Sequence, residues 1–469
     1  MFGLFTASII MLIPLIGTIF IALTDKKNVL GIKSVSFWTS LFALCFSVFI
    51  AILFDYSTEK FTEEVCLFSN SIVKYRVGLD VLSVLFVPII CLICFLCILW
   101  ITKRKSQKKK TYFMSILLFE TFSIGAFYAW DIFLLFMMIE STIIPIYIIM
   151  SQRREQSNDA IFHFLIYTMS SAILILIAFI LIYLETHTSN IIEIYKIGVK
   201  NKAVFWLLIL GIGIKMPIWP FYNWLPIAHV KSQTICSVLL AAIVLKFSTL
   251  LILRFIDPLF MNIFLENKQW VLFFISLSML FSTSQLIFQD DLKRVFAYFS
   301  IIHLNMAFLI LLSGMGKGYF IFTVMHHSLL TSVLFFSANI VKRLYGTRLI
   351  SELKNISTQL KEVRRVILFS FLCLISVPFS WGFISEILTI QAISKISTTY
   401  TVITSAIILI SSLYAMHVYN SCFGYWRNGD IFEINDFYVT DIYKKLALFI
   451  LFGIIIIIGL FPKIILGCF

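Results

Sequence analysis

The chain has 469 residues, of which 60% are hydrophobic and only 13% are charged, and its formal net charge is +13. This apolar content exceeds what the core of a soluble protein can use, so the composition excludes a soluble globular protein and predicts an integral membrane protein. Many of the basic residues lie beside long apolar segments, where Lys and Arg typically set the orientation of membrane spans. We therefore expect the lipid bilayer, and no nucleic acid, to be their partner.

The apolar segments have the length of membrane-spanning helices. Such a helix needs about 20 mostly apolar residues. Polar interruptions divide the chain into candidates near residues 3–24, 32–54, 80–101, 112–129, 131–150, 160–184, 203–222, 230–257, 270–289, 295–314, 318–341, 365–390, 400–423 and 446–468. The sequence therefore predicts an all-α polytopic membrane protein with fourteen transmembrane helices.

The loops between these segments differ in charge. Most of the 37 Lys and Arg residues fall in the odd-numbered loops, including the run KRKSQKKK at 103–110. Loops on the cytoplasmic or matrix side retain Lys and Arg. This asymmetry predicts that both termini face outward.

The predicted spans near 203–222 and 365–390 each contain a charged residue together with proline. Pro217 and Pro220 follow Lys215, and Pro378 precedes Glu386. Proline interrupts a helix, and broken helices inside a membrane create sites for ions and charged side chains at mid-depth. If spans 4–8 and 9–13 form two five-helix units, each break lies in the fourth span of its unit. Because five is odd, the second unit must insert upside down, which is the inverted-repeat arrangement of a transporter.

This pattern predicts the organisation of the chain. A segment of three helices is followed by the first five-helix repeat, the second inverted repeat and a last helix. The expected boundaries are 1–111, 112–257, 270–424 and 425–469.

Ionisable residues inside spans are rare, and each is a candidate for function. Here they form a series that alternates acids with Lys and His. The candidates for proton transfer are Glu140, Lys215, Lys246, His303, His327 and Glu386. Six such groups in six different spans favour a path over isolated contacts between helices.

Each of these residues also has a structural interpretation. A Lys can snorkel to the membrane interface, Glu140 can serve only to hold a Lys, and a buried neutral His can satisfy a neighbour. Glu120 and His163 are interpreted as packing or interface groups, and His417 stays open. His326 is adjacent to the candidate His327 and points about 100° around the helix, so only one of the two is expected to face a given path.

The cysteines do not indicate a cofactor site. Cys91, Cys94 and Cys97 have the spacing that begins an iron–sulfur run, yet the fourth Cys is missing and the window is wholly apolar. Small buried side chains on a packed helix are the favoured interpretation. The sequence also has no phosphate-binding loop and no metal-spaced His pair, so we expect this chain to bind neither a metal nor a redox cofactor.

Together these residues resemble the antiporter-like subunits of complex I, the NADH:quinone oxidoreductase. Within that family the likeness is greatest to the type called chain M in bacteria and subunit 4 in mitochondria. The matching motifs include VGLDVLSVLF (77–86), KMPIWPFYNWLPIAH (215–229), DDLKRVFAYFSIIH (290–303) and LYAMHVYNSCFG (413–424). Glu140, five residues before Pro145, and Glu386 also match.

The resemblance implies a role for each candidate residue. Glu140 and Lys215 would form the pair of the first half-channel, and Lys246 would be the central bridge. His303 and His327 would belong to the second half, and Glu386 would be the terminal group. The sister chains typically carry Lys at the last position, so an acid there favours chain M.

The sequence departs from the family pattern at four positions. The family usually has Asp where this chain has Ile227, Pro and Gly where it has Gln233 and Cys236, and Gly where it has Ser385. These departures concern loop geometry and close helix approach, because the titratable residues are kept.

The function implied by the resemblance is proton translocation coupled to NADH oxidation and quinone reduction in other subunits. NADH, FMN, iron–sulfur clusters and quinone are expected in those partner subunits, and the neighbours would be the antiporter-like chains L and N. The bacterial inner membrane is the favoured location, otherwise the mitochondrial inner membrane. The alternatives are a subunit of a multisubunit cation/proton antiporter or membrane-bound hydrogenase, and a scaffold subunit with vestigial charges.

Overall fold

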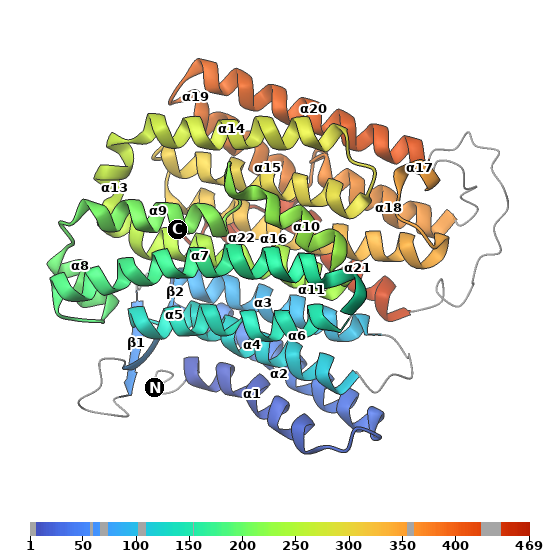
Figure 1. Cartoon of the computed structure of the whole chain (residues 1–469), viewed down its shortest axis with the longest axis horizontal. Coiled ribbons are helices and arrows are strands. Elements are labelled where there is room, and N and C mark those ends of the chain that lie inside the picture. Colours follow the sequence, from blue (N-terminus) through green and yellow to red (C-terminus); the bar gives the residue numbers. More distant parts are fainter. Residues whose placement is uncertain are drawn as a thin grey trace. The chain divides into compact units, whose positions relative to one another are not determined.

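The computed structural model describes residues 6–56, 60–65, 74–101, 109–152, 154–353, 361–423 and 442–469. Most of the run KRKSQKKK and the first part of the predicted C-terminal segment lie outside these residues. The chain folds into helices of widely different length and one small β-hairpin (Figure 1).

The chain packs as two compact units. Unit 1 comprises Met1–Lys215 and Ile243–Glu266, and unit 2 comprises Met216–Ala242 and Asn267–Phe469. The chain therefore leaves unit 1 at Lys215, one of the charged residues expected inside a span. The boundaries predicted from the sequence were drawn from a symmetry between repeats, whereas these two units are defined by their internal packing. The predicted boundaries therefore stay predictions.

Unit 1 contains the helices that carry the first three candidate residues. Its elements are α1 (Thr6–Leu23), α2 (Val29–Leu53), β1 (Lys60–Val65), β2 (Tyr75–Asp80), α3 (Val81–Trp100), α4 (Lys109–Tyr128), α5 (Ile132–Ser141), α6 (Ile143–Ser151), α7 (Arg154–Thr186), α8 (Ile191–Ile197), α9 (Lys202–Lys215), α12 (Lys246–Leu251), the π-helical turn η3 (Ile252–Ile256) and α13 (Asp257–Glu266).

The first helices of unit 1 pack side by side, α1 against α2 and α4, and α3 against α2 and α4 (Figure 1). Strands β1 and β2 pair antiparallel, with Lys60 opposite Asp80, and this hairpin was not expected from the sequence. Asp80 then begins α3 through a capping box. Its side chain accepts from the Ser83 N–H, and the Ser83 hydroxyl oxygen accepts from the Asp80 N–H.

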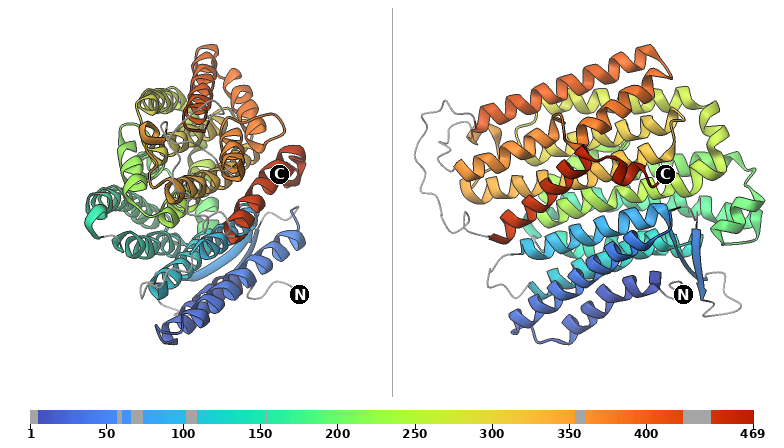
Figure 2. Two further views of the ribbon diagram at one scale, coloured as in Figure 1. Left: turned by 90° about the vertical axis from the view of Figure 1, so that its right-hand side faces the viewer. Right: turned by 180° about the vertical axis from the view of Figure 1, so that it is seen from behind.

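Unit 2 contains the helices that carry the remaining candidates. Its elements are the 3-10 turn η1 (Phe221–Asn223), α10 (Trp224–Lys231), α11 (Thr234–Leu239), α14 (Lys268–Ile287), α15 (Leu292–Leu312), α16 (Lys317–Tyr345), α17 (Ile350–Leu353), α18 (Lys361–Leu374), α19 (Trp381–Ser394), α20 (Thr398–Phe423), α21 (Ile442–Leu460) and α22 (Lys463–Leu466). Helix α15 packs between α14 and α16, and α21 packs on α16 and α19 (Figure 2).

The helices agree with the spans expected from the sequence. Twelve helical segments among the described residues are long and apolar enough to cross a membrane. The two remaining expected spans, near 203–222 and 365–390, are interrupted helices: α9 followed by α10, and α18 followed by α19. The prediction of an all-α polytopic fold with discontinuous helices is confirmed.

The two interruptions have local causes. The first follows Lys215, where Pro217 and Pro220 cannot donate backbone hydrogen bonds to continue α9. In the second, Ser376 and Phe379 adopt positive φ angles of 54° and 72°, which turn the chain between α18 and α19.

A different irregularity lies between α11 and α13. The π-helical turns η2 (Leu240–Val244) and η3 flank α12, so Lys246 begins a short helix of only two turns between two wide ones. Turns of this kind are rare and are frequent at functional sites. The spacing of apolar residues gave no sign of them.

Candidate functional site

Glu140 and Lys215 form an ion pair in unit 1. The Lys215 Nζ donates to Glu140 Oε1 at 2.9 Å. The side chain of Lys215 is 3% exposed and that of Glu140 is 18% exposed, so the ammonium group is the more deeply buried partner. The two residues are 75 positions apart in the sequence, and the structure brings them together as expected.

Both members of the pair lie at the end of a helix. Glu140 precedes the irregular step at Thr142, where α5 ends and α6 begins, and the Thr142 hydroxyl donates to the Ile139 carbonyl oxygen. Pro145 removes the N–H that would continue the helix across this step. Lys215 is the last residue of α9, where the helix dipole favours a cation. The pair is therefore held at two points where the backbone is interrupted.

Lys246 is buried, with 1% of its surface exposed. Its helix, α12, packs against α9, the helix that ends in Lys215. The next residue, Phe247, contacts Phe127 of α4 through their rings. The second Lys of the predicted series is thus placed on a helix adjacent to the first.

In unit 2, His303 lies on α15 and His326 and His327 lie on α16, and all three are buried. The contacts of α16 with the second break involve His326. Its ring lies 6.0 Å from the Trp381 ring, measured between centroids, and a Cβ built on Gly382 would lie 2.9 Å from the His326 Cε1 atom. The sequence favoured His327, whereas the geometry places His326 beside the break.

Glu386 lies on α19, one turn beyond Gly382 and half-buried. The side chain of Ser376, from the break itself, lies beside the Glu386 carboxyl group. The same hydroxyl oxygen would be 2.6 Å from a Cβ on Gly382. Gly382 therefore permits the close approach of Ser376 and His326 to the start of α19.

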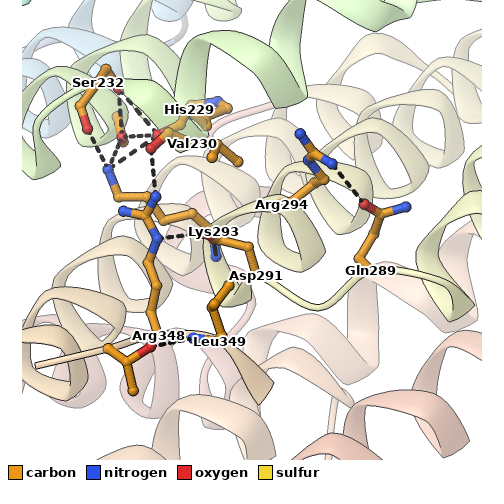
Figure 3. Close-up of polar contacts among 11 residues, drawn as sticks. His229, Val230, Ser232, Gln289, Asp291, Lys293, Arg294, Arg348 and Leu349 are labelled. Carbon is orange, nitrogen blue, oxygen red and sulfur yellow. Dashed lines mark hydrogen bonds and ion pairs between the residues drawn. The ribbon is translucent and has the colours of Figure 1, made fainter. Parts of the chain in front are cut away.

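A second polar cluster in unit 2 was not identified from the sequence. Lys293, near the start of α15, donates from Nζ to the carbonyl oxygens of His229 at 3.1 Å and Ser232 at 2.9 Å, and to the Ser237 hydroxyl at 2.7 Å (Figure 3). Arg348 donates to the Val230 carbonyl oxygen at 2.6 Å. Lys293 lies just before the span predicted near 295–314, so the sequence did not mark it as a charge inside the membrane.

Unit 1 contains a comparable cluster around Arg254. Its guanidinium group donates to the backbone carbonyl oxygens of Phe127, at 2.7 Å, and Ala129. It also lies 3.5 Å from Asp80 Oδ2 and 4.1 Å from the centre of the Trp130 ring. Arg254 is therefore bound by the ends of two other helices.

Asp131, between α4 and α5, anchors the start of the helix that carries Glu140. Its carboxylate accepts from the N–H groups of Phe133 and Leu134 and from the Ser189 hydroxyl at 2.5 Å. Burial raises the pKa of Asp131, although these hydrogen bonds and the guanidinium of Arg76 oppose the shift. The sequence gave no role to this residue.

The residues whose roles the sequence left open have separate environments. Glu120 is buried on α4 and accepts from the Ser40 hydroxyl at 3.3 Å. His163 contacts the Asp159 carbonyl oxygen at 2.7 Å within α7, and His417 lies 3.4 Å from the Ser421 hydroxyl within α20. Each of these two His contacts lies within a single helix.

The positions that depart from the family pattern are accommodated within regular elements. Ile227 lies within α10, and α11 begins directly after Gln233 with Cys236 buried in its first turn. The Ser385 hydroxyl donates to the Trp381 carbonyl oxygen inside α19 at 3.2 Å. The helices on both sides of each break therefore form with these side chains in place.

The described residues contain no group of three or more His, Cys, Asp or Glu side chains arranged to hold a metal ion. Cys91, Cys94 and Cys97 are buried on α3. The candidate residues are cations and acids near helix interruptions and buried imidazoles within α15 and α16, groups that are suited to holding and passing protons.

Comparison with known proteins places the chain in a family of membrane proteins. Residues 129–411 match the family model described as NADH:quinone oxidoreductase/Mrp antiporter, TM. The chain is 28% identical to the NADH-quinone oxidoreductase subunit M of Rickettsia typhi, over 98% of this chain and 96% of that one. It is 26% identical to the NADH-ubiquinone oxidoreductase chain 4 of Marchantia polymorpha, over 98% and 94%.

The fold is also known from solved structures. A chain of respiratory complex I from Thermus thermophilus superposes with a TM-score of 0.81 at 20% sequence identity, covering 98% of this chain and 97% of that one. This likeness is one of fold.

Proposed function

Because the chain belongs to the NADH:quinone oxidoreductase/Mrp antiporter membrane family, we propose that it is the proton-translocating chain M, or subunit 4, of complex I. The full-length similarity to subunits of that name supports this assignment. Glu386, rather than the Lys of the sister chains, supports the same choice. The observation that carries the mechanism is the buried ion pair between Glu140 and Lys215 at two interrupted helices.

The pair can act as a switch for one proton. An ammonium group in a low-dielectric site is stabilised by a nearby carboxylate, so withdrawal of Glu140 would make the Lys215 proton easier to release. At 2.9 Å the attraction is about 6 kcal/mol if the effective dielectric constant is about 20. Moving one proton against roughly 150 mV costs about 3.5 kcal/mol. The attraction that must be overcome to separate the pair is therefore comparable in size to the cost of one transport step.

The remaining groups extend this switch within each unit. Lys246, on the helix next to α9, would accept the proton from the first pair. In unit 2, His303 and His327 would carry a proton toward Glu386 at the second break. We assign proton transfer to Glu140, Lys215, Lys246, His303, His327 and Glu386.

The energy for transport would come from partner subunits. NADH oxidation through FMN and iron–sulfur clusters and the reduction of quinone are assigned to other chains of the complex, and chains L and N would flank this one in the membrane. The bilayer would be the bacterial inner membrane or the mitochondrial inner membrane.

A cation/proton antiporter subunit is the main alternative, since the family description includes Mrp antiporters. Transport of a metal cation favours clustered carboxylate oxygens. In the described candidate site the Glu140 carboxylate is paired with the Lys215 ammonium group and not with a second carboxylate. This arrangement favours protons.

The test separates the structural role of the ion pair from its role in transport. Glu140→Gln leaves a buried ammonium without its carboxylate and should lower the amount of assembled complex, since such a loss costs about 3–5 kcal/mol. The double variant Glu140→Gln/Lys215→Met removes both charges and should restore assembly. It should not pump protons in inverted vesicles supplied with NADH and quinone. Pumping at the parental rate by the double variant would reject the proposal. If proton pumping by the parent complex required sodium, the antiporter alternative would be favoured.

A further inference from the structure

The cluster around Lys293 lies where half-helix α10 ends. The last carbonyl groups of an α-helix have no partner within it and must be satisfied from outside. The Ala228 carbonyl oxygen accepts from the Ser232 N–H at 3.2 Å. The next two, of His229 and Val230, accept from the side chains of Lys293 and Arg348. Two cations thus complete the end of this helix, where the helix dipole also favours them.

The ammonium group of Lys293 occupies a cage of oxygen atoms. Its three acceptors are two backbone carbonyls and one hydroxyl, at 2.7–3.1 Å, and only 2% of the residue is exposed. The neighbouring Asp291 is engaged elsewhere: its Oδ1 accepts from the Lys293 N–H and its Oδ2 lies 2.5 Å from Arg348 Nε. The oxygen atoms of the cage are all uncharged. The cation that they bind is the ammonium group of Lys293, which is covalently part of α15.

The same contacts join three elements of unit 2. Lys293 belongs to α15, which carries His303. Arg348 follows α16, which carries His327. Both side chains hold α10, the half-helix that resumes the chain after the break at Lys215 (Figure 3).

We propose that Lys293 is a positioning residue, a tethered cation that fixes the end of α10 against α15 and thereby keeps the groups of unit 2 in the register that proton transfer requires. The expected effect of Lys293 on pumping rests on the proposed function. The docking of α10 by Lys293 is independent of what the protein transports.

The experiment compares Lys293→Met with Lys293→Arg and with Arg294→Met in the complete, purified complex. Met keeps the length of the side chain and removes the charge, whereas Arg keeps a cation and N–H donors. Arg294 is the matched control, because it is the adjacent cation and its guanidinium group contacts Gln289 at 3.5 Å and not α10 (Figure 3).

Hydrogen exchange at the backbone amides of residues 224–237 is the first measurement. Lys293→Met should exchange faster there by about tenfold, as expected when the end of a helix is released. Lys293→Arg should remain closer to the parent, and Arg294→Met should match it. Unchanged exchange in assembled Lys293→Met would overturn the inference. Should that variant fail to assemble, Lys293→Gln, which is neutral but keeps an N–H donor, gives the same comparison.

Proton pumping per assembled complex is the second measurement. It should fall about tenfold or more in Lys293→Met, because small displacements of reacting groups are costly, and should recover in part in Lys293→Arg. Parental pumping together with faster exchange would overturn the positioning role and leave the proposed function intact. The proposed function itself is tested separately, by the double variant of Glu140 and Lys215.

A chemical substitute tests the cage directly. In Lys293→Ala, ammonium chloride should slow exchange at residues 224–237, because the free ammonium ion can donate to the same three oxygens. Tetramethylammonium chloride at the same concentration cannot donate hydrogen bonds and should have no effect. Equal effects of the two salts would contradict a specific cation cage.

Discussion

Gly459 of α21 lies directly against the backbone of Phe379 in the second helix break. A Cβ built on Gly459 would lie 2.3 Å from the Phe379 carbonyl oxygen and 2.6 Å from the Trp381 nitrogen. Irregular backbone in a membrane is tolerated only where protein or water covers it. The last long helix therefore covers the break before Glu386 through a residue without a side chain.

We predict that Gly459→Ala disturbs this contact. The added methyl group meets backbone atoms that cannot rotate away, and overpacking of this kind costs about 1–3 kcal/mol. The variant should assemble less well and lose activity on heating sooner than the parent. Thermal inactivation of NADH-driven quinone reduction in isolated membranes measures the effect.

Gly453 provides a matched control on the same helix. A Cβ at Gly453 would meet no atom within 4 Å. Gly453→Ala should therefore be tolerated, and alanine is the better helix former by about 1 kcal/mol. Equal losses in both variants would mean that α21 tolerates no alanine at all and that the contact with the break is not the cause.

Arg254 should behave as a structural cation, in contrast to Lys215. Its guanidinium group donates to the carbonyl oxygens of Phe127 and Ala129 and pairs with the Asp80 carboxylate, and a guanidinium does not release its proton in proteins. Arg254→Met should lower the yield of assembled complex, because each lost hydrogen bond to a charged group costs about 1.5–3 kcal/mol. The complexes that do assemble should pump normally. A pumping defect per assembled complex would place Arg254 among the functional residues.

The sequence predicted the spans and the breaks because both depend on local properties. About 20 apolar residues can only be helical in a bilayer, and proline interrupts a helix wherever it occurs. The ion pair between Glu140 and Lys215 was also predictable, since a buried acid and a buried base each need a partner. The spans, the breaks and the need of each buried charge for a partner can therefore be inferred without knowing which helices pack together.

The clusters around Lys293 and Arg254 could not be predicted in the same way. Their partners are backbone carbonyl oxygens, which every residue has, so no side chain in the sequence marks them. The π-helical turns around Lys246 are likewise invisible, because a wide turn changes no residue type. The choice between His326 and His327 depends on which side of α16 faces the break near Gly382. That orientation is visible in the structure but not in the sequence.

The two histidines of α16 should differ in effect. His326 lies against the break that precedes Glu386, whereas the resemblance to the family assigns the proton to His327. We predict that His326→Gln lowers pumping at least as much as His327→Gln, because its ring contacts the first turn of α19. Rates of pumping and of quinone reduction in the two variants decide the matter. A normal His326→Gln variant would return the role to His327 alone.

Glu386 should require a group that titrates. It lies one turn beyond Gly382, and Ser376 of the break lies beside its carboxyl group, so the helix interruption and the acid form one site. Glu386→Gln keeps the shape and the hydrogen bonding but cannot hold or release a proton at this position, and it should sharply reduce coupled turnover. Glu386→Asp shortens the reach by one methylene and should retain part of the activity. Proton pumping and quinone reduction in the same vesicles measure both variants.

Glu386→Lys completes the series, because it reverses the charge and supplies the residue type that the sister chains typically carry. If the site needs only a titratable group, this variant should keep partial pumping while Glu386→Gln does not. If the site needs an acid, Lys should be worse than Gln, since its ammonium would place a positive charge where the carboxylate belongs. Reduction of an artificial acceptor by the peripheral subunits controls for assembly and should stay normal throughout. Parental pumping in all three variants would remove Glu386 from the path and with it the mechanistic reason for assigning this chain to the M type.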